Sequence, residues 1–148
     1  MGDTTVLPAG ISEGGLVDPP VSLSGSIIHG KGLGKTVGMP TANLDITGAA
    51  LPLPPGVYAV KILVLGEWRI GVTNIGPRPS VDSVPVTTVE TLILDFNQDI
   101  YGERVLIRTY LFLRPIQKFS GLEEVKAQVE RDSLRAREFF KTEAPGTR

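Results

Sequence analysis

The sequence predicts a mostly β protein, an antiparallel barrel with one C-terminal α-helix packed against it. Several short segments alternate apolar and polar residues or are rich in β-branched residues, and proline-containing loops separate them. From about residue 120 onward the apolar residues recur at the spacing of a helix instead. Short strands followed by one terminal helix are typical of a sheet that closes on itself and is covered on one side.

The N-terminal segment, residues 1–20, lacks periodicity and is rich in Gly, Pro, Asp and Ser, so we expect a flexible arm there. Gly66-Glu67 joins two of the strands that follow into a hairpin. Because side chains alternate along a strand, Thr88, Glu90 and Leu92 should share one face. The expected strands cover residues 21–28, 56–65, 68–75, 86–96 and 104–113.

The helix is expected to open at Ser120-x-x-Glu123, a capping box, and to run to about Phe140. Asp132 interrupts its apolar stripe, so this residue lies either on the flank of the helix or in the interior with a partner. Residues 142–148 should form a flexible tail, which leaves 21–141 as one domain. The apolar stripe consists of Leu122, Val125, Val129, Ala136 and Phe140.

Composition argues against several classes of protein. The chain has 148 residues, a formal net charge of −1, no cysteine and one histidine, His29. Without a basic excess, binding to nucleic acid or to a membrane surface is not expected. A disulfide framework, a thiolate metal site, a Ser-His-Asp triad and a multi-histidine zinc site are equally unexpected. The chain shows no apolar run of membrane length and no secretory signal, so we expect a cytoplasmic protein. We also expect a monomer.

The most informative segment is 30–43, which reads Gly-Lys-Gly-Leu-Gly-Lys-Thr-Val-Gly-Met-Pro-Thr-Ala-Asn. Glycines let the backbone approach an anion and present N–H donors to it, and lysine adds positive charge. Thr41 and Asn43 then offer a hydroxyl and an amide oxygen, which are ligands suited to Mg²⁺. The segment combines the parts that bind a nucleoside triphosphate with its metal, although a flexible surface turn would show similar glycines.

Two better-known phosphate loops do not fit. The first glycine of a Walker A loop would fall on His29, and Gly38 and Pro40 prevent a helix from following at once. A Gly-x-Gly-x-x-Gly dinucleotide fingerprint fails because Gly34 comes one position early.

The order of several short motifs identifies a family. After the glycine-rich segment come Gly56-Val-Tyr, Asn74-Ile-Gly-Pro-Arg-Pro, Val89-Glu90-Thr, Asp95-Phe96, Tyr101-Gly102, Leu113-Arg114-Pro and Lys118-Phe119-Ser-x-Leu-Glu, with Asp132 in the helix. In this order, over about residues 23–137, the chain resembles riboflavin kinase (flavokinase), including the kinase module of bacterial bifunctional riboflavin kinase/FAD synthetases.

The resemblance implies a Greek-key β-barrel with a C-terminal helix. It also implies ATP-dependent, Mg²⁺-dependent phosphorylation of the ribityl 5′-hydroxyl of riboflavin, giving FMN and ADP. Riboflavin, FMN, ATP and ADP are then the expected ligands. The adenylyltransferase domain that usually precedes this module in bacteria finds no match here, so the expected protein partner is a separate FAD synthetase.

The resemblance also assigns roles to particular residues. Glu90 matches the catalytic glutamate, and Thr41 and Asn43 match the Mg²⁺-associated pair. Arg114, Gln117 and Phe119 fall where the family contacts the flavin. The positions implied to bind ATP are Gly30, Lys35, Thr41, Ile93 and Tyr101.

Departures and alternatives remain open at this point. Lys35 replaces an arginine common in bacterial members, and Ser80 replaces a threonine. Glu90 could instead be a solvent-facing strand residue. Arg114 could pair with an acid such as Asp132, and Phe119 could form a hydrophobic staple with the helix. The alternative functions are a non-catalytic flavin-binding or regulatory module, and an unrelated barrel used as an interaction platform.

Overall fold

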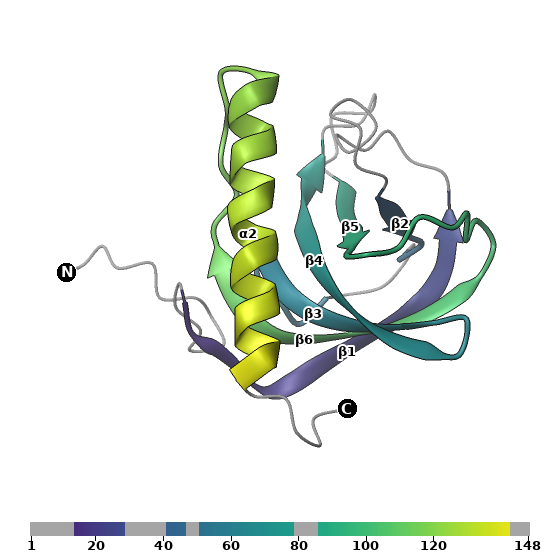
Figure 1. Cartoon of the computed structure of the whole chain (residues 1–148). Coiled ribbons are helices and arrows are strands. Elements are labelled where there is room, and N and C mark those ends of the chain that lie inside the picture. The colour runs from purple at the N-terminus through teal and green to yellow at the C-terminus, as the bar shows by residue number, and fades with distance from the viewer. Residues whose placement is uncertain (1–13, 29–40, 47–50, 79–85, 143–148) are drawn as a thin grey trace.

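The computed structural model describes residues 14–28, 41–46, 51–78 and 86–142, which form six strands and one long helix (Figure 1). The elements are β1 (Leu16–Ile28), β2 (Ala42–Leu44), β3 (Gly56–Val64), β4 (Glu67–Arg78), β5 (Val86–Ile93), β6 (Arg104–Arg114) and α2 (Leu122–Thr142).

The six strands close into an antiparallel barrel in the order β1-β2-β5-β4-β3-β6, with β6 paired back to β1. Strands β3, β4 and β5 follow one another as hairpins, and β6 returns to lie beside β3. This order is the Greek-key arrangement, so the predicted barrel and its topology are confirmed.

Alternate residues of each strand fill the barrel interior, as the period of two requires. Tyr58 and Phe112 are its largest fully buried side chains, and their rings meet edge to face with centroids 5.2 Å apart. The Tyr58 hydroxyl donates a hydrogen bond of 2.6 Å to the Pro54 carbonyl oxygen, and burial raises the pKa of this phenol well above its usual value. The interior is therefore a packed core.

Helix α2 lies along the outside of the barrel against β3 and β4 (Figure 1). A second apolar cluster joins it to the outer faces of the strands, because Ala136 and Phe140 are buried against Val57, Ala59 and Val72. At the surface, Arg137 donates to Asp95 at 2.7 Å and holds the pKa of that carboxyl below its usual range. One face of the barrel is thus covered by the helix.

Several elements differ from the sequence expectations. The short strand β2 was not predicted, β4 extends from Glu67 to Arg78, β5 ends at Ile93, and α2 starts at Leu122 and continues to Thr142. Strand β1 begins at Leu16, inside the segment 1–20 expected to be a flexible arm, because Gly14 N–H donates to the Phe112 carbonyl at 2.8 Å and continues the ladder with β6. At the helix start, Glu124, not Glu123, accepts from the Ser120 N–H at 3.0 Å, and this bond lowers the pKa of Glu124. Residues 1–13 and 143–148 lie outside the described part.

Helix α2, the one long helix in the described part of the chain, is too polar to cross a membrane.

Close contact at the start of β3 gives a test of the barrel. A Cβ placed on Gly56 would stand 2.1 Å from Cε1 of the Phe112 ring. We expect Gly56→Ala to lower the free energy of unfolding by about 1–3 kcal/mol, the usual cost of overpacking a core. Chemical denaturation measures this difference.

The matched control is Gly121→Ala, because a Cβ at Gly121 meets nothing within 4 Å. It should cost less than about 1 kcal/mol, the cap preference alone. Equal losses in the two variants would contradict the packing explanation.

Candidate active site

Residues that are far apart in the sequence form one row around the outside of the barrel. Each pair of neighbours in this row is directly opposed in the register of two adjacent strands, where Cβ atoms stand about 5 Å apart. From β6 to β1 the row, called the site row below, consists of Arg114, Val57, Asn74, Glu90, Asn43 and Ile28.

The buried neighbours of Glu90 explain why it faces outward. Val89 and Thr91 are each 1% exposed and point into the barrel, where the Thr91 hydroxyl lies 2.7 Å from the Thr73 hydroxyl. Because side chains alternate, Glu90 must lie on the outer face. It is partly buried there, and so is Thr88, whose hydroxyl donates to the Gly76 carbonyl at 3.2 Å. The predicted shared face of Thr88, Glu90 and Leu92 is what the structure shows.

The carboxylate of Glu90 is held by Thr41. The Thr41 hydroxyl donates a short hydrogen bond to Oε2 of Glu90, although the two residues are 49 positions apart. Asn43, two residues after Thr41, is opposed to Glu90 in the β2–β5 ladder. The structure therefore brings the predicted catalytic residue and the predicted metal pair together.

These side chains fit a magnesium ion only in company with a phosphate ligand. Thr41 and Asn43 are neutral oxygen donors, and Glu90 is the one carboxylate of the group. Among the described residues, no cluster of three or more His, Cys, Asp or Glu side chains is present. Mg²⁺ in nucleotide enzymes is commonly held by one or two protein oxygens together with substrate phosphates, and Thr41 and Asn43 offer two such protein oxygens.

At the other end of the site row, Arg114 binds Asp132 of the helix and the carbonyl of Pro115. Its Nη2 lies 2.8 Å from Oδ2 of Asp132, its Nε donates to both carboxylate oxygens at 3.1 Å, and Nη1 donates to the Pro115 carbonyl at 3.2 Å. Asp132 is 1% exposed and also accepts from Gln128 at 3.0 Å. Asp132 is thus a buried acid with a partner, one of the two alternatives left open by the sequence.

The segment between β6 and α2 lies over the outer face of β4. A Cβ on Gly76 would stand 3.2 Å from Cδ1 of Ile116. Phe119 is partly buried, with its ring centroid 5.8 Å from the Arg114 guanidinium, and Gln117 is exposed. Ile116 is 44% exposed, so an uncovered apolar surface adjoins the polar part of the site row.

The predicted nucleotide residues are spread more widely. Gly30 and Lys35 lie outside the described residues, in the connection whose ends, Ile28 and Asn43, are opposed in the site row. Tyr101 is 56% exposed and precedes Gly102, whose N–H donates to the Ile27 carbonyl at 2.9 Å. Ile93 is 5% exposed in the barrel core, on the opposite face of β5 from Glu90. The structure does not bring the Ile93 side chain to the site row.

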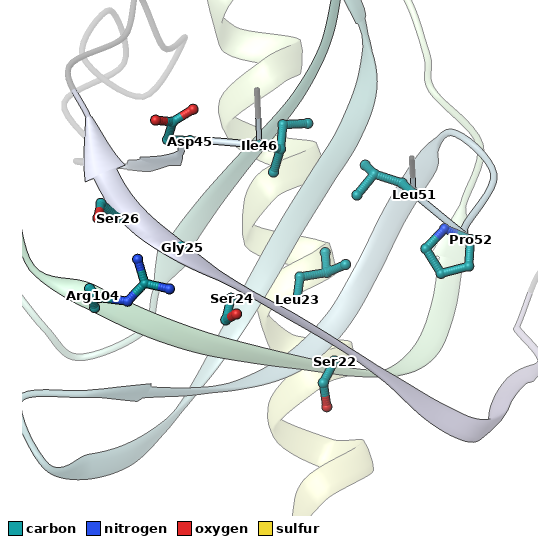
Figure 2. A pocket seen from close by; sticks show the side chains of 10 residues that line it. All are labelled: Ser22, Leu23, Ser24, Gly25, Ser26, Asp45, Ile46, Leu51, Pro52 and Arg104. Atoms are coloured by element: carbon teal, nitrogen blue, oxygen red, sulfur yellow. The ribbon is translucent and has the colours of Figure 1, made fainter. Parts of the chain in front are cut away.

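A hollow of about 430 Å³ lies between β1 and the connection that follows β2 (Figure 2). Ser22, Ser24 and Ser26 line it from β1 with Arg104 from β6, and Asp45, Ile46, Leu51 and Pro52 lie across from them. Because Ser26 is two residues before Ile28, the hollow adjoins the β1–β2 end of the site row. That end is remote from the apolar segment at Ile116.

Asn74 stands in the centre of the site row, and the motif analysis gave it no role. The available signals were its place at the start of the Asn74-Ile-Gly-Pro-Arg-Pro motif and its position in a strand, where asparagine is uncommon. Sequence alone could not show that Asn74 is opposed to Glu90, because the register of β4 on β5 places residues 16 positions apart side by side.

The family model and the curated relatives that match this chain point to the same family. The riboflavin kinase (flavokinase) family model matches residues 17–140. A bifunctional riboflavin kinase/FMN adenylyltransferase from Escherichia coli K12 is 43% identical over 126 residues, which cover 84% of this chain and 40% of that protein. The chain therefore spans about 40% of the length of this relative and of the bifunctional relative from Bacillus subtilis.

Two solved structures share the fold. A chain titled macrolide-efflux protein from Streptococcus pneumoniae superposes with a TM-score of 0.73 at 30% identity, over 80% of this chain and 38% of that one. Riboflavin kinase from Trypanosoma brucei superposes with a TM-score of 0.59 at 21% identity, over 87% and 89% of the two chains. The second likeness supports the fold alone.

The Arg114–Asp132 pair yields a second prediction. Asp132→Asn should lower the free energy of unfolding by about 3–5 kcal/mol, because it leaves the Arg114 guanidinium largely buried without its counter-charge. The control is Glu130→Gln on the same helix, an exposed acid whose replacement should change stability by less than about 0.5 kcal/mol. Thermal and denaturant unfolding measure both. A loss at Asp132 no larger than at Glu130 would show that the pair adds nothing to the fold.

Proposed function

Since this chain belongs to the riboflavin kinase family, we propose that it transfers the γ-phosphoryl group of ATP to the ribityl 5′-hydroxyl of riboflavin, giving FMN and ADP. The observation that carries the proposal is the hydrogen bond from Thr41 to Glu90 within the site row. It joins a carboxylate that can accept a proton to a segment suited to a nucleotide and its metal.

Glu90 serves as the general base in this proposal. A primary hydroxyl is a weak nucleophile at neutral pH, and a carboxylate within hydrogen-bond reach accepts its proton as the new O–P bond forms. Oε2 of Glu90 already accepts from Thr41, which fixes the orientation of the carboxylate and leaves Oε1 for the substrate. A hydroxyl has lone pairs as well as a proton, so Thr41 can donate to Glu90 while its oxygen faces a cation.

Thr41 and Asn43 are the residues that would hold Mg²⁺, which would supply positive charge to stabilise the transferring phosphates. We assign the phosphates of ATP to the β1–β2 end of the site row, from which the glycine-rich connection departs. The hollow beside Ser24 and Ser26 adjoins that end, and its volume of about 430 Å³ is of the size that receives small ligands.

The flavin ring then belongs at the opposite end. Ile116 and Phe119 offer the apolar and aromatic surface that a planar ring system requires. Arg114 has its guanidinium engaged by Asp132 and Pro115, so we assign it the role of holding the 115–119 segment in place. A non-catalytic flavin-binding module would need this end alone, and it gives no reason for the Thr41–Glu90 pair at the other.

The activity itself is the first test. Purified chain with riboflavin, ATP and Mg²⁺ should yield FMN and ADP in equal amounts, separated and quantified by chromatography. Flavin binding without FMN, across several divalent metals and nucleotides, would instead favour the binding-module alternative.

Glu90→Gln tests the assignment of the base. The amide keeps the size of the side chain and can still accept from Thr41, but it cannot take up the ribityl proton, so kcat should fall by about 10²–10⁴-fold. Riboflavin affinity should change little, because at most one hydrogen-bond acceptor is altered.

Glu103→Gln is the control, since this exposed glutamate lies in the turn before β6. Its kcat should equal that of the unaltered chain. A Glu90→Gln enzyme within a few-fold of that value would mean that the proton leaves by another route, such as the phosphate itself.

A further inference from the structure

Asn74 lies directly beside Glu90 in the site row, on the strand that Ile116 covers at Gly76. In the β4–β5 ladder it is opposed to Glu90, and in the β3–β4 ladder it is opposed to Val57, which is 3% exposed. Neighbouring strands lie about 4.8 Å apart, so Val57 and Glu90 are roughly 10 Å apart across the sheet. Asn74 stands midway along that path.

The surroundings of Asn74 leave its carboxamide open to a ligand. Its chain neighbours Thr73 and Ile75 are buried inside the barrel, so Asn74 itself faces outward, where it is exposed. A Cβ on Gly76 would stand 3.8 Å from Oδ1 of Asn74 and 3.2 Å from Cδ1 of Ile116, so Ile116 packs directly over the bare glycine and lies near Asn74. Within the described residues, the Asn74 side chain makes no hydrogen bond.

The chemistry of the carboxamide fits a polyol. Its NH₂ group donates and its oxygen accepts, and a hydroxyl group likewise does both, so each can satisfy the other. An ionised Glu90 can accept hydrogen bonds but cannot donate them, and the Val57 side chain has no polar atom. Among Val57, Asn74 and Glu90, Asn74 is consequently the residue whose side chain can both donate to and accept from a secondary hydroxyl.

We propose that Asn74 is a specificity-determining residue that binds a secondary hydroxyl of the ribityl chain and so aligns the terminal 5′-hydroxyl on Glu90. This inference rests on the proposed function, in which the ring lies at Ile116 and the 5′-hydroxyl at Glu90. The chain that joins ring to hydroxyl then passes beside Asn74, which is opposed to Glu90 and lies two residues before Gly76. The alternative is that Asn74 is simply a solvated strand residue, and it would then bind no particular hydroxyl of the substrate.

The test pairs a variant with substrate analogues. Binding of riboflavin and of its 2′-, 3′- and 4′-deoxy analogues to the unaltered chain and to Asn74→Ala is measured by flavin fluorescence in the presence of Mg-ADP. In a separate assay, kcat/KM is measured for each flavin with each protein. Asn74→Ala should lower the affinity for riboflavin by roughly 3- to 12-fold, which corresponds to the loss of one hydrogen bond between uncharged groups. For one deoxy analogue the two proteins should be equal, because the contact is already missing.

Asn97→Ala is the matched control, since Asn97 is exposed in the segment after β5. It should treat all four flavins as the unaltered chain does, and the melting temperatures of the three proteins should agree.

The outcomes separate the two proposals. If the unaltered chain binds riboflavin but makes no FMN, the kinase proposal fails while the analogue pattern still decides the role of Asn74. The proposed role of Asn74 is overturned if Asn74→Ala leaves riboflavin affinity unchanged. It is also overturned if the substitution lowers the affinities for all four flavins by the same factor. Failure of the unaltered chain to bind riboflavin overturns both.

Discussion

The register of the β2-β5-β4 ladders is the constraint on which the site depends. Slipping β5 by one residue would turn Glu90 into the barrel and bring Val89 and Thr91 out, since side chains alternate along a strand. The core resists this slip because Val89 and Thr91 are each 1% exposed, and the Thr91 hydroxyl pairs with that of Thr73. Packing inside the barrel therefore sets the chemistry on its outer face.

The helix sets the other end of the site row. Asp132 binds Arg114 from α2, and Phe119 stacks near the same guanidinium, so the segment that we assign to the flavin is tied to both the sheet and the helix. A buried ion pair adds little net stability compared with apolar packing, but its fixed geometry defines one position for the segment. The segment that carries Ile116 is thereby held over β4, the strand next to the one that carries Glu90.

The sequence predicted the class of fold well, because alternation and the change to helical spacing report directly on burial. It could not fix the start of β1 at Leu16, since Pro19 and Pro20 in that part of the strand resemble a loop. Motif order identified Glu90, Thr41 and Asn43 as candidates, and the structure places them together. The contribution of Asn74 and the engagement of Arg114 by Asp132 depend on strand register and tertiary packing, which local patterns do not encode. Ile93 shows the converse, a motif position whose side chain lies in the core.

The central claim is that the site row orders the substrates, with the flavin ring at Ile116, the ribityl chain at Asn74 and the phosphates beyond Glu90. A crystal structure of the chain with riboflavin and Mg-ADP measures this order directly. The account predicts the ribityl 5′-oxygen within hydrogen-bond distance of Oε1 of Glu90, with the ring against Ile116 and Phe119. A ring bound instead beside Ile28 and Tyr101, with the 5′-oxygen away from Glu90, would contradict it.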